Sequence, residues 1–324
     1  MFISLFVSNA LLTVLFILFL MRIARQRKIM MSQDTPVIGG IGMGLSFLAT
    51  FALYLFSSRT GQHQLSATII ASLVMLIFGI LDDLKELSVL KQFMVQVIAT
   101  SVLVFFGVRT NIAHIGILAN IVITYIWVIG ITNSINLLDV MDGVAGAVTL
   151  VISLSFCAIS MLTGQIAVTI LSLTLSGMVA GFLFFNLPKA RVYMGNSGSH
   201  FLGFLLAAIA IMISYSDSSR RVALFSPLLI LGFPIFDTLF LIMIRLIKGK
   251  SAFNKSNDHL VLRMLKVGYS KKKALFLMAA ITFFFAVAGI VVSRSVNAIA
   301  LVVVSFMACW SILLAFKMGR VAIE

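Results

Sequence analysis

Charged side chains are scarce in this chain of 324 residues: they make up only 10% of it, whereas hydrophobic side chains make up 61%. A soluble globular domain carries about 25% charged residues, so the composition excludes a soluble enzyme. It also excludes a disordered chain, because disorder requires many charges and few apolar residues. The mean hydropathy of +1.16 is typical of an integral membrane protein.

Cysteine is also rare, since Cys157 and Cys309 are the only two and both lie in apolar runs. Neither has a partner at a metal-ligand spacing, so the sequence encodes no disulfide framework and no thiolate zinc site. The net charge of +14 comes from basic residues scattered between apolar segments. Nucleic-acid binding would require a soluble basic domain, which is absent. The charge distribution therefore indicates a membrane protein with a cationic face.

Long apolar runs dominate the chain. A bilayer core about 30 Å thick requires about 20 apolar residues per helix. The first run has no basic residue before it and no cleavage site after it, which is typical of an uncleaved helix. No connector is long enough to fold separately, so residues 1–324 are predicted to form one all-α polytopic membrane domain. Eleven transmembrane helices are predicted near 3–21, 37–56, 67–81, 92–107, 113–132, 147–162, 166–184, 199–215, 222–247, 275–293 and 296–315.

The charges predict the orientation of these helices. With the N-terminus outside, all but five of the 24 Lys and Arg residues fall in inner connectors or the C-terminal tail. This asymmetry follows the positive-inside rule and places the C-terminus in the cytoplasm. All of the ten acidic residues except Asp217 also fall inside. Because carboxylates contribute little to topology, we infer that a divalent cation and an anionic substrate meet at the cytoplasmic surface.

Asp82 and Asp83 are adjacent acids at the end of an apolar run. Two carboxylates at a low-dielectric boundary repel each other unless a cation neutralises them. The pair therefore suits a general base or a magnesium ligand. The alternative is a solvated helix end that carries ordinary loop charges.

Asn136, Asp139 and Asp142 follow at intervals of three residues, so on a helix they would share roughly one face. No Lys or Arg lies between Arg109 and Lys189, and the two acids therefore lack a local partner. Unpaired acids at a membrane boundary indicate a functional site. The alternative is a pair of cap residues that flank a glycine turn.

A segment rich in glycine and serine, residues 195–199, directly precedes an apolar helix. Backbone N–H groups at such a helix start can bind an anion, and Tyr193 could stack on a base. Small residues also allow close helix packing in membranes, which is the favoured interpretation for the glycines at 39–44.

A last group of polar residues consists of Asp237, Arg245 and His259. An acid within an apolar helix requires a partner or a ligand, so Asp237 could form a structural ion pair with Arg245 or belong to a site. A lone histidine such as His259 is most often an ordinary surface residue, and only its neighbours favour a functional role.

In this order, and on one side of the membrane, these segments resemble the polyprenyl-phosphate N-acetylhexosamine-1-phosphate transferases of glycosyltransferase family 4. The resemblance is greater to the N-acetylglucosamine-1-phosphate branch, with eleven helices, than to the N-acetylmuramoyl-pentapeptide branch, whose triple-histidine loop is absent. The matching residues are Asp82, Asp83, Leu87, Ser88, Lys91, Asn133, Asn136, Asp139, Asp142, Gly143, Gly195, Gly198, Ser199, Leu202, Gly203, Phe204, Pro234, Asp237 and Thr238.

The resemblance implies a reaction of cell-envelope glycan synthesis at the cytoplasmic (inner) membrane. A UDP-sugar and a polyprenyl phosphate such as undecaprenyl phosphate would give a lipid-pyrophosphoryl-sugar and UMP, with magnesium, or manganese in its place, on the pyrophosphate. Such chemistry consists mostly of charge neutralisation and alignment. Nucleic acid has no part in it. The sugar, the prenyl chain length and the oligomeric state, a homodimer included, stay open.

The resemblance also implies roles for the residues that match the family's motifs. Asp82 would act as the base or orient the lipid phosphate, and Asp83 would support the metal. His259 would lie over the sugar-phosphate end. The expected site residues are, for catalysis, Asp82, Asp83 and His259; for substrate binding, Lys91, Asn133, Asn136, Asp139, Asp142, Tyr193, Gly198, Ser199 and Arg263; and for the metal, Asn196, Asp83 and Asp142.

The chain departs from the family pattern at three places. Val140 replaces a glycine, which should alter the turn after Asp139. The loop 259–263 retains only one of three histidines, so sugar selectivity is open. Asn196 replaces the family's magnesium-binding aspartate, so the charge is lost although a carbonyl ligand remains.

Two other classes of function compete with the transferase. A catalytically silent relative would bind lipid phosphate or UDP-sugar as a partner protein, and Asn196 is its main support. A transporter would place acids near the middle of the membrane and show an inverted repeat. The acids instead cluster at one boundary, and no repeat is visible in the sequence.

Overall fold

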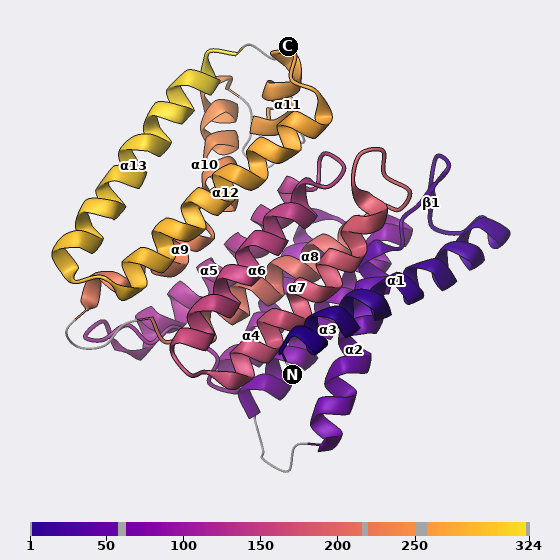
Figure 1. Ribbon diagram of the computed structural model, residues 1–324, viewed down its shortest axis with the longest axis horizontal. Helices are drawn as coiled ribbons and strands as arrows, with labels where there is room; N and C mark the ends of the chain where they lie inside the picture. The colour runs from indigo at the N-terminus through magenta and orange to yellow at the C-terminus, as the bar shows by residue number, and fades with distance from the viewer. Residues whose placement is uncertain (1, 58–62, 216–219, 250–257, 322–324) are drawn as a thin grey trace.

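The computed structural model describes residues 2–57, 63–215, 220–249 and 258–321. Helices account for most of this part of the chain (Figure 1). The expected all-α architecture has one small exception, an antiparallel hairpin of two strands, β1 (Met31–Ser32) and β2 (Thr35–Pro36). The α-helices are α1 Phe2–Arg27, α2 Gly39–Ser57, α3 His63–Lys85, α4 Val89–Phe105, α5 Gly116–Leu138, α6 Val144–Leu162, α7 Ile166–Asn186, α8 Gly195–Met212, α9 Ser226–Ile230, α10 Gly232–Ile247, α11 Leu260–Lys266, α12 Lys271–Arg294 and α13 Asn297–Gly319.

Each expected span overlaps helical structure, and the protein is a multi-pass membrane protein. Eight helices within the described ranges are long and apolar enough to cross a bilayer, or up to nine if a bent pair is one span. Helix α4 is shorter, and so is Gly39–Ala52, the part of α2 that enters this comparison. Asp217, the one acidic residue expected on the outer side, lies outside the described residues.

The prediction of one unbroken helix for residues 222–247 is wrong, because this segment is bent. A 3-10 helix, η1 (Arg221–Phe225), and α9 together form a segment that is bent by 70° relative to α10. Pro227 lies in the first turn of α9, and Pro234 lies in the first turn of α10. A proline has no N–H to donate, so it is tolerated at a helix start but not in a helix interior.

Helix α8 lies at the centre of the molecule, in contact with α2, α3, α5, α6 and α7. Residues 197–210 of α8 are buried without interruption, polar and apolar alike. A helix that is buried all round belongs to the core. By contrast, α1 and α13 expose large apolar side chains such as Phe19 and Val302. In a membrane protein, lipid covers such surfaces.

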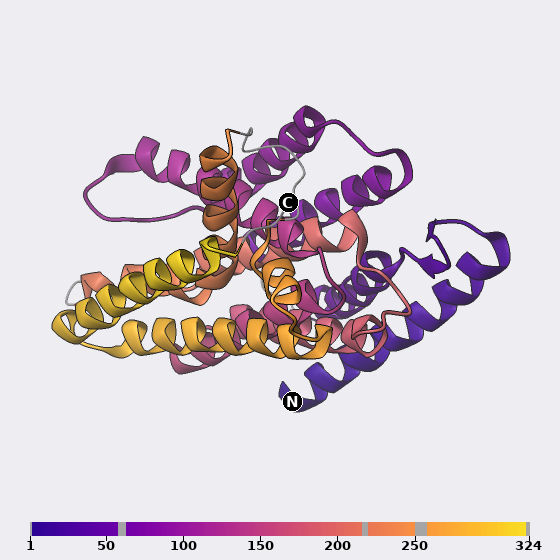
Figure 2. The ribbon, with the colours of Figure 1, turned by 90° about the horizontal axis from the view of Figure 1, so that it is seen from above.

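Helices α12 and α13 form an antiparallel pair at one edge of the molecule, beside α9 and α10 (Figures 1 and 2). Helix α12 packs on α6, which connects the pair to the block formed by α1–α8. The short helix α11 also contacts α12. The C-terminal part of the chain therefore lies against α6, which begins directly after the polar turn that contains Asp142.

Glycines bring α2 and α3 against the start of α8. A Cβ atom on Gly79 would lie 2.4 Å from Cα of Ser197, and one on Gly40 would lie 2.1 Å from the backbone N of Gly198. The interpretation of the 39–44 glycines as packing residues is therefore confirmed at Gly40. Since Asp83 follows Gly79 by one helical turn, the close approach places this acid at the N-terminus of α8.

Candidate active site

Asp83 connects the end of α3 to the first turn of α8. Its Oδ1 accepts the backbone N–H of Asn196 at 2.6 Å, and its Oδ2 accepts that of Ser197 at 3.0 Å. A carboxylate at this position satisfies N–H groups that have no partner within the helix, and it interacts favourably with the helix dipole. Gly195 has a φ of +74°, and a Cβ there would lie 2.6 Å from Oδ2 of Asp83. The turn therefore requires glycine.

Asp82 is buried beside this contact. Its Oδ1 accepts the N–H of Leu87 at 2.6 Å, and its Oδ2 accepts Nε2 of Gln92 at 3.2 Å. The alternative of a solvated helix end is wrong for Asp82, because its carboxylate is held in a defined orientation. The loop between α3 and α4 fixes this acid.

Asn136 joins the end of α5 to the same turn of α8. Its Nδ2 donates to Oδ1 of Asn196 at 3.2 Å and to Oγ of Ser199 at 2.9 Å. Three segments far apart in the sequence thus meet at one point, as the motif order predicts. Asn133, one turn earlier, has a different setting: it exchanges two amide hydrogen bonds with Gln96, at 3.1 and 2.8 Å. That pair joins α4 to α5.

The prediction that Asn136, Asp139 and Asp142 share a helix face is wrong, because α5 ends at Leu138. Asp139 is the C-cap residue of α5, and Asp142 lies in the turn before α6. The alternative of cap residues at a glycine turn holds locally, since Gly143 has a φ of +82°. Asp142 Oδ2 accepts the N–H of Ala190 at 3.3 Å, which connects this turn to the segment before α8.

Although these acids do not share a helix face, the carboxylates of Asp83 and Asp142 affect the pKa of Asp139. Burial raises the pKa of Asp139 to about 7, and the carboxylates of Asp83 and Asp142 contribute to the same shift. Within the described residues, none of Asp82, Asp83, Asp139 and Asp142 forms an ion pair with Lys or Arg. Among the described parts of the chain, no Lys or Arg therefore pairs with the acids of this site.

This acidic cluster suits a divalent cation only in part. No group of three His, Cys, Asp or Glu residues among those described has the geometry to hold a metal ion. Mg²⁺ usually takes one or two carboxylates and completes its shell with water and substrate phosphates. A carboxylate offers about four lone-pair sites and an amide carbonyl two, so Asp83 and Asn196 can accept a cation beside their present hydrogen bonds. The residues fit a magnesium ion that the substrate helps to hold.

His259 belongs to a second buried group of polar residues and directly precedes α11. Its Nδ1 lies 3.0 Å from Oδ2 of Asp237, while Oδ1 of Asp237 accepts the N–H of Leu260 at 3.0 Å. Both side chains are at least 97% buried, so His259 is not an ordinary surface residue. In a neutral imidazole, a carboxylate at Nδ1 favours the tautomer with the proton on Nδ1, which leaves Nε2 unprotonated.

Arg263 does not occupy the position expected of a substrate ligand. It is 1% exposed and stacks over the ring of Phe240. Its guanidinium donates to Asp258 and to the carbonyl groups of Met318 and Val321. The last carbonyls of a helix require donors, and Arg263 supplies them at the end of α13. The structure thus gives this arginine a structural position.

The remaining expected residues have settings that differ from one another. Lys91 is exposed in the first turn of α4, and Tyr193 is partly buried. The backbone of Tyr193 exchanges hydrogen bonds with Pro36 and Gly39, at 2.9 Å each. Gly198 is fully enclosed against Gly40, so its backbone has a packing function.

Several polar residues near the site belong to none of the motifs in the sequence. Gln92 orients Asp82. Asn186 accepts the N–H of Gly143 and donates to the carbonyl of Val192, at 2.9 Å each, and thereby joins the turns before α6 and α8. His200 is buried, and neither ring nitrogen has a hydrogen-bond partner among the described residues. The sequence feature that could have indicated these residues is an amide or imidazole side chain within an apolar run.

The comparisons with known proteins agree with the motifs. The family model "Glycosyl transferase family 4" matches residues 65–214, which include the acids and the start of α8 but not His259. The chain is 29% identical over 272 residues to the probable undecaprenyl-phosphate N-acetylglucosaminyl 1-phosphate transferase of Bacillus subtilis (strain 168), covering 80% of this chain and 74% of that protein.

Two further relatives differ in coverage. The decaprenyl-phosphate N-acetylglucosaminephosphotransferase of Mycobacterium leprae (strain TN) is 29% identical over 279 residues, covering 75% of this chain and 70% of that protein. A phospho-N-acetylmuramoyl-pentapeptide-transferase of Clostridium beijerinckii is 31% identical over 164 residues, covering 50% and 47%. The resemblance inferred from the motifs is confirmed.

Proposed function

Because the chain belongs to glycosyl transferase family 4, the polyprenyl-phosphate sugar-1-phosphate transferases, we propose that it transfers a sugar 1-phosphate from a UDP-sugar to a polyprenyl phosphate. The products are a polyprenyl-pyrophosphoryl-sugar and UMP. The sugar is an N-acetylhexosamine, which is supported by the names of the relatives. The observation that carries the proposal is the convergence of Asp83, Asn136 and Asn196 at one junction of three helices.

The geometry supports a division of labour among the residues. Asp82, held by Leu87 and Gln92, orients the lipid phosphate or takes its proton. Asp83, Asp142 and Asn196 are the proposed ligands of Mg²⁺, which when bound neutralises charge on the pyrophosphate. Asp139, which lies among the acids, is proposed to contact the nucleotide. His259, held at Nδ1 by Asp237, presents Nε2 to the sugar phosphate.

We also propose that all eleven apolar segments cross the inner membrane, with the N-terminus outside and the C-terminus in the cytoplasm. Eight long helices, the bent pair and the shorter α2 and α4 make up that number. This arrangement places Asp82, Asp142 and the start of α8 on the cytoplasmic side, where a UDP-sugar is available. The excess of Lys and Arg in the inner connectors supports it.

A transferase assay tests the function directly. Purified protein is incubated with radiolabelled UDP-N-acetylglucosamine, undecaprenyl phosphate and magnesium, and released UMP is measured. The matched control is Asp82→Asn, which keeps the size of the side chain. UMP release by the wild type and not by the variant is the expected result. A wild-type protein that releases no UMP with any UDP-sugar, but that binds one of them, would favour the silent relative, for which Asn196 is the supporting observation.

A further inference from the structure

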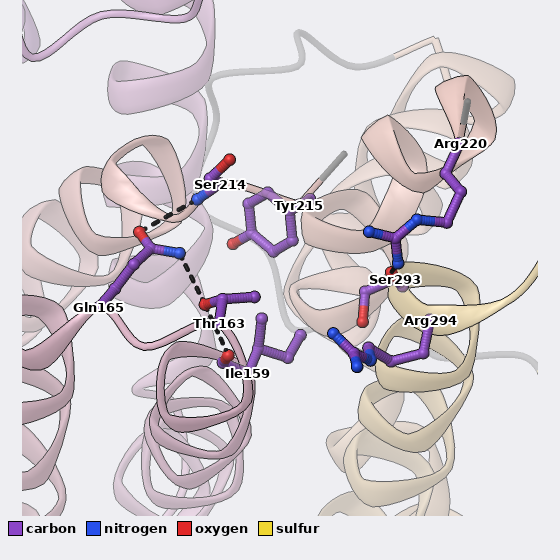
Figure 3. A pocket seen from close by; sticks show the side chains of 8 residues that line it. All are labelled: Ile159, Thr163, Gln165, Ser214, Tyr215, Arg220, Ser293 and Arg294. Carbon is purple, nitrogen blue, oxygen red and sulfur yellow. Dashed lines mark hydrogen bonds between the residues drawn. The ribbon is translucent and has the colours of Figure 1, made fainter. Parts of the chain in front are cut away.

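A cavity of about 310 Å³ lies where α6 and α8 end (Figure 3). Both helices begin at the candidate active site, near Asp142 and Gly195, and contain 19 and 18 residues. At 1.5 Å per residue each is about 27 Å long, so the cavity is separated from the acids by roughly the thickness of a bilayer core. It is therefore a second place where a ligand can bind.

We propose that this cavity binds a phosphate group at the end of the molecule opposite the candidate active site. Arg220 and Arg294 line it from one side, and Figure 3 shows both guanidinium groups directed toward it. Among the residues that the structure describes, eight line the cavity and none of these is acidic. A guanidinium presents planar N–H donors whose geometry matches that of phosphate oxygens. The lining therefore selects for an anion.

The arginines are placed before a ligand arrives. Arg294 is the last residue of α12, and Arg220 directly precedes η1. Arg220 Nη1 donates to the carbonyl of Ser293 at 3.0 Å, which fixes one guanidinium beside the other. Two cations from separate elements thus line one cavity.

Tyr215 supplies an independent observation. It lines the cavity opposite the arginines, its side chain is buried, and its hydroxyl has no hydrogen-bond partner among the described residues. A buried hydroxyl without a partner is unfavourable. A tyrosine hydroxyl is protonated at neutral pH and can therefore donate a hydrogen bond. A bound phosphate oxygen is the acceptor that it lacks.

The surroundings favour a lipid as the source of the phosphate. Tyr215 also lines a neighbouring groove of about 520 Å³, whose walls include Trp127, Ile211, Leu224 and Leu228. An anionic headgroup beside an apolar groove is the combination that a phospholipid or a prenyl phosphate offers. A soluble phosphate ester would use only the cationic cavity.

Native mass spectrometry of the detergent-purified full chain, titrated with phosphatidylglycerol, tests the proposal. We expect Arg294→Gln to bind the lipid about tenfold more weakly than the wild type, because a hydrogen bond to a charged group is lost. Tyr215→Phe should also bind more weakly without losing thermal stability. The matched control is Arg221→Gln, an exposed arginine in η1 that does not line the cavity. It should bind as the wild type does.

A second arm replaces the lipid with inorganic phosphate and follows the melting temperature. Stabilisation of the wild type but not of Arg294→Gln by phosphate, without lipid binding, would support the cavity as a phosphate site and identify a soluble ligand. If Arg294→Gln and Tyr215→Phe bind both ligands as the wild type does, the proposal is wrong. This holds even if the variants are less stable, because the side chains would then have only a structural function.

Discussion

Asp139 should make the stability of this protein depend on pH. Burial and the carboxylates of Asp83 and Asp142 raise its pKa from 3.8 to about 7. Between these two values the folded chain keeps a proton that the unfolded chain releases, so the free energy of unfolding falls as pH rises through this window. Each pKa unit corresponds to about 1.4 kcal/mol. An ionised Asp139 therefore costs about 4 kcal/mol of stability above pH 7.

Replacing Asp139 with asparagine should remove this cost. We expect the wild type to lose thermal stability between pH 5 and pH 8, and Asp139→Asn to lose little. With an unfolding entropy of about 2.1 cal/mol/K for each of the 324 residues, 1 kcal/mol corresponds to about 1.5 °C, so the two melting temperatures should differ by about 6 °C at pH 8. The measurement is thermal unfolding in detergent, followed by tryptophan fluorescence.

The matched control is Asp34→Asn, because Asp34 is exposed in the turn between β1 and β2. This variant should retain the wild-type dependence on pH. Equal pH dependence in Asp139→Asn and the wild type would refute the reasoning, because the group that carries the proton would then lie elsewhere.

Four further predictions concern activity and topology. Asp82→Asn should lower UMP release by about 10²–10⁴-fold, and turnover within threefold of the wild type would remove Asp82 from the site. Asn196→Asp should lower the magnesium concentration for half-maximal turnover, and an unchanged magnesium titration would place residue 196 away from the metal. Asp237→Asn should lower kcat and shift the pH profile if Asp237 orients His259, whereas a loss of thermal stability alone would indicate a structural pair. A cysteine at Ser256 should be protected from an impermeant thiol reagent added to intact cells, and labelling from outside would overturn the proposed orientation.

The composition alone determined the class of protein. With 61% hydrophobic side chains in long runs, the chain cannot expose its backbone to lipid except as helices, because each N–H and C=O must find a partner within its own segment. Helix positions follow from this local requirement, and each predicted span therefore overlaps helical structure. The span predicted for residues 222–247 is broken at Leu231: Pro227 and Pro234 were visible in the sequence, but the 70° bend was not.

The motifs also determined which segments meet, because acids and amides at the ends of apolar helices belong at a membrane boundary. What each residue contacts was decided only by the tertiary structure. Arg263 was expected at the substrate, yet it binds the carbonyl groups at the end of α13, some 55 residues away in the chain. Gln92 and Asn186 carried no motif, yet they orient Asp82 and the turn at Gly143.

The physical reason is the range of the interactions. Hydrophobic periodicity and helix ends depend on neighbours within a few residues, so they can be read along the chain. Hydrogen bonds and charges act over a few ångströms in space and connect residues that the sequence separates widely. Asp83 shows this directly: its position at the end of α3 was predictable, but its contact with α8, 113 residues later, depends on the close approach that Gly79 permits.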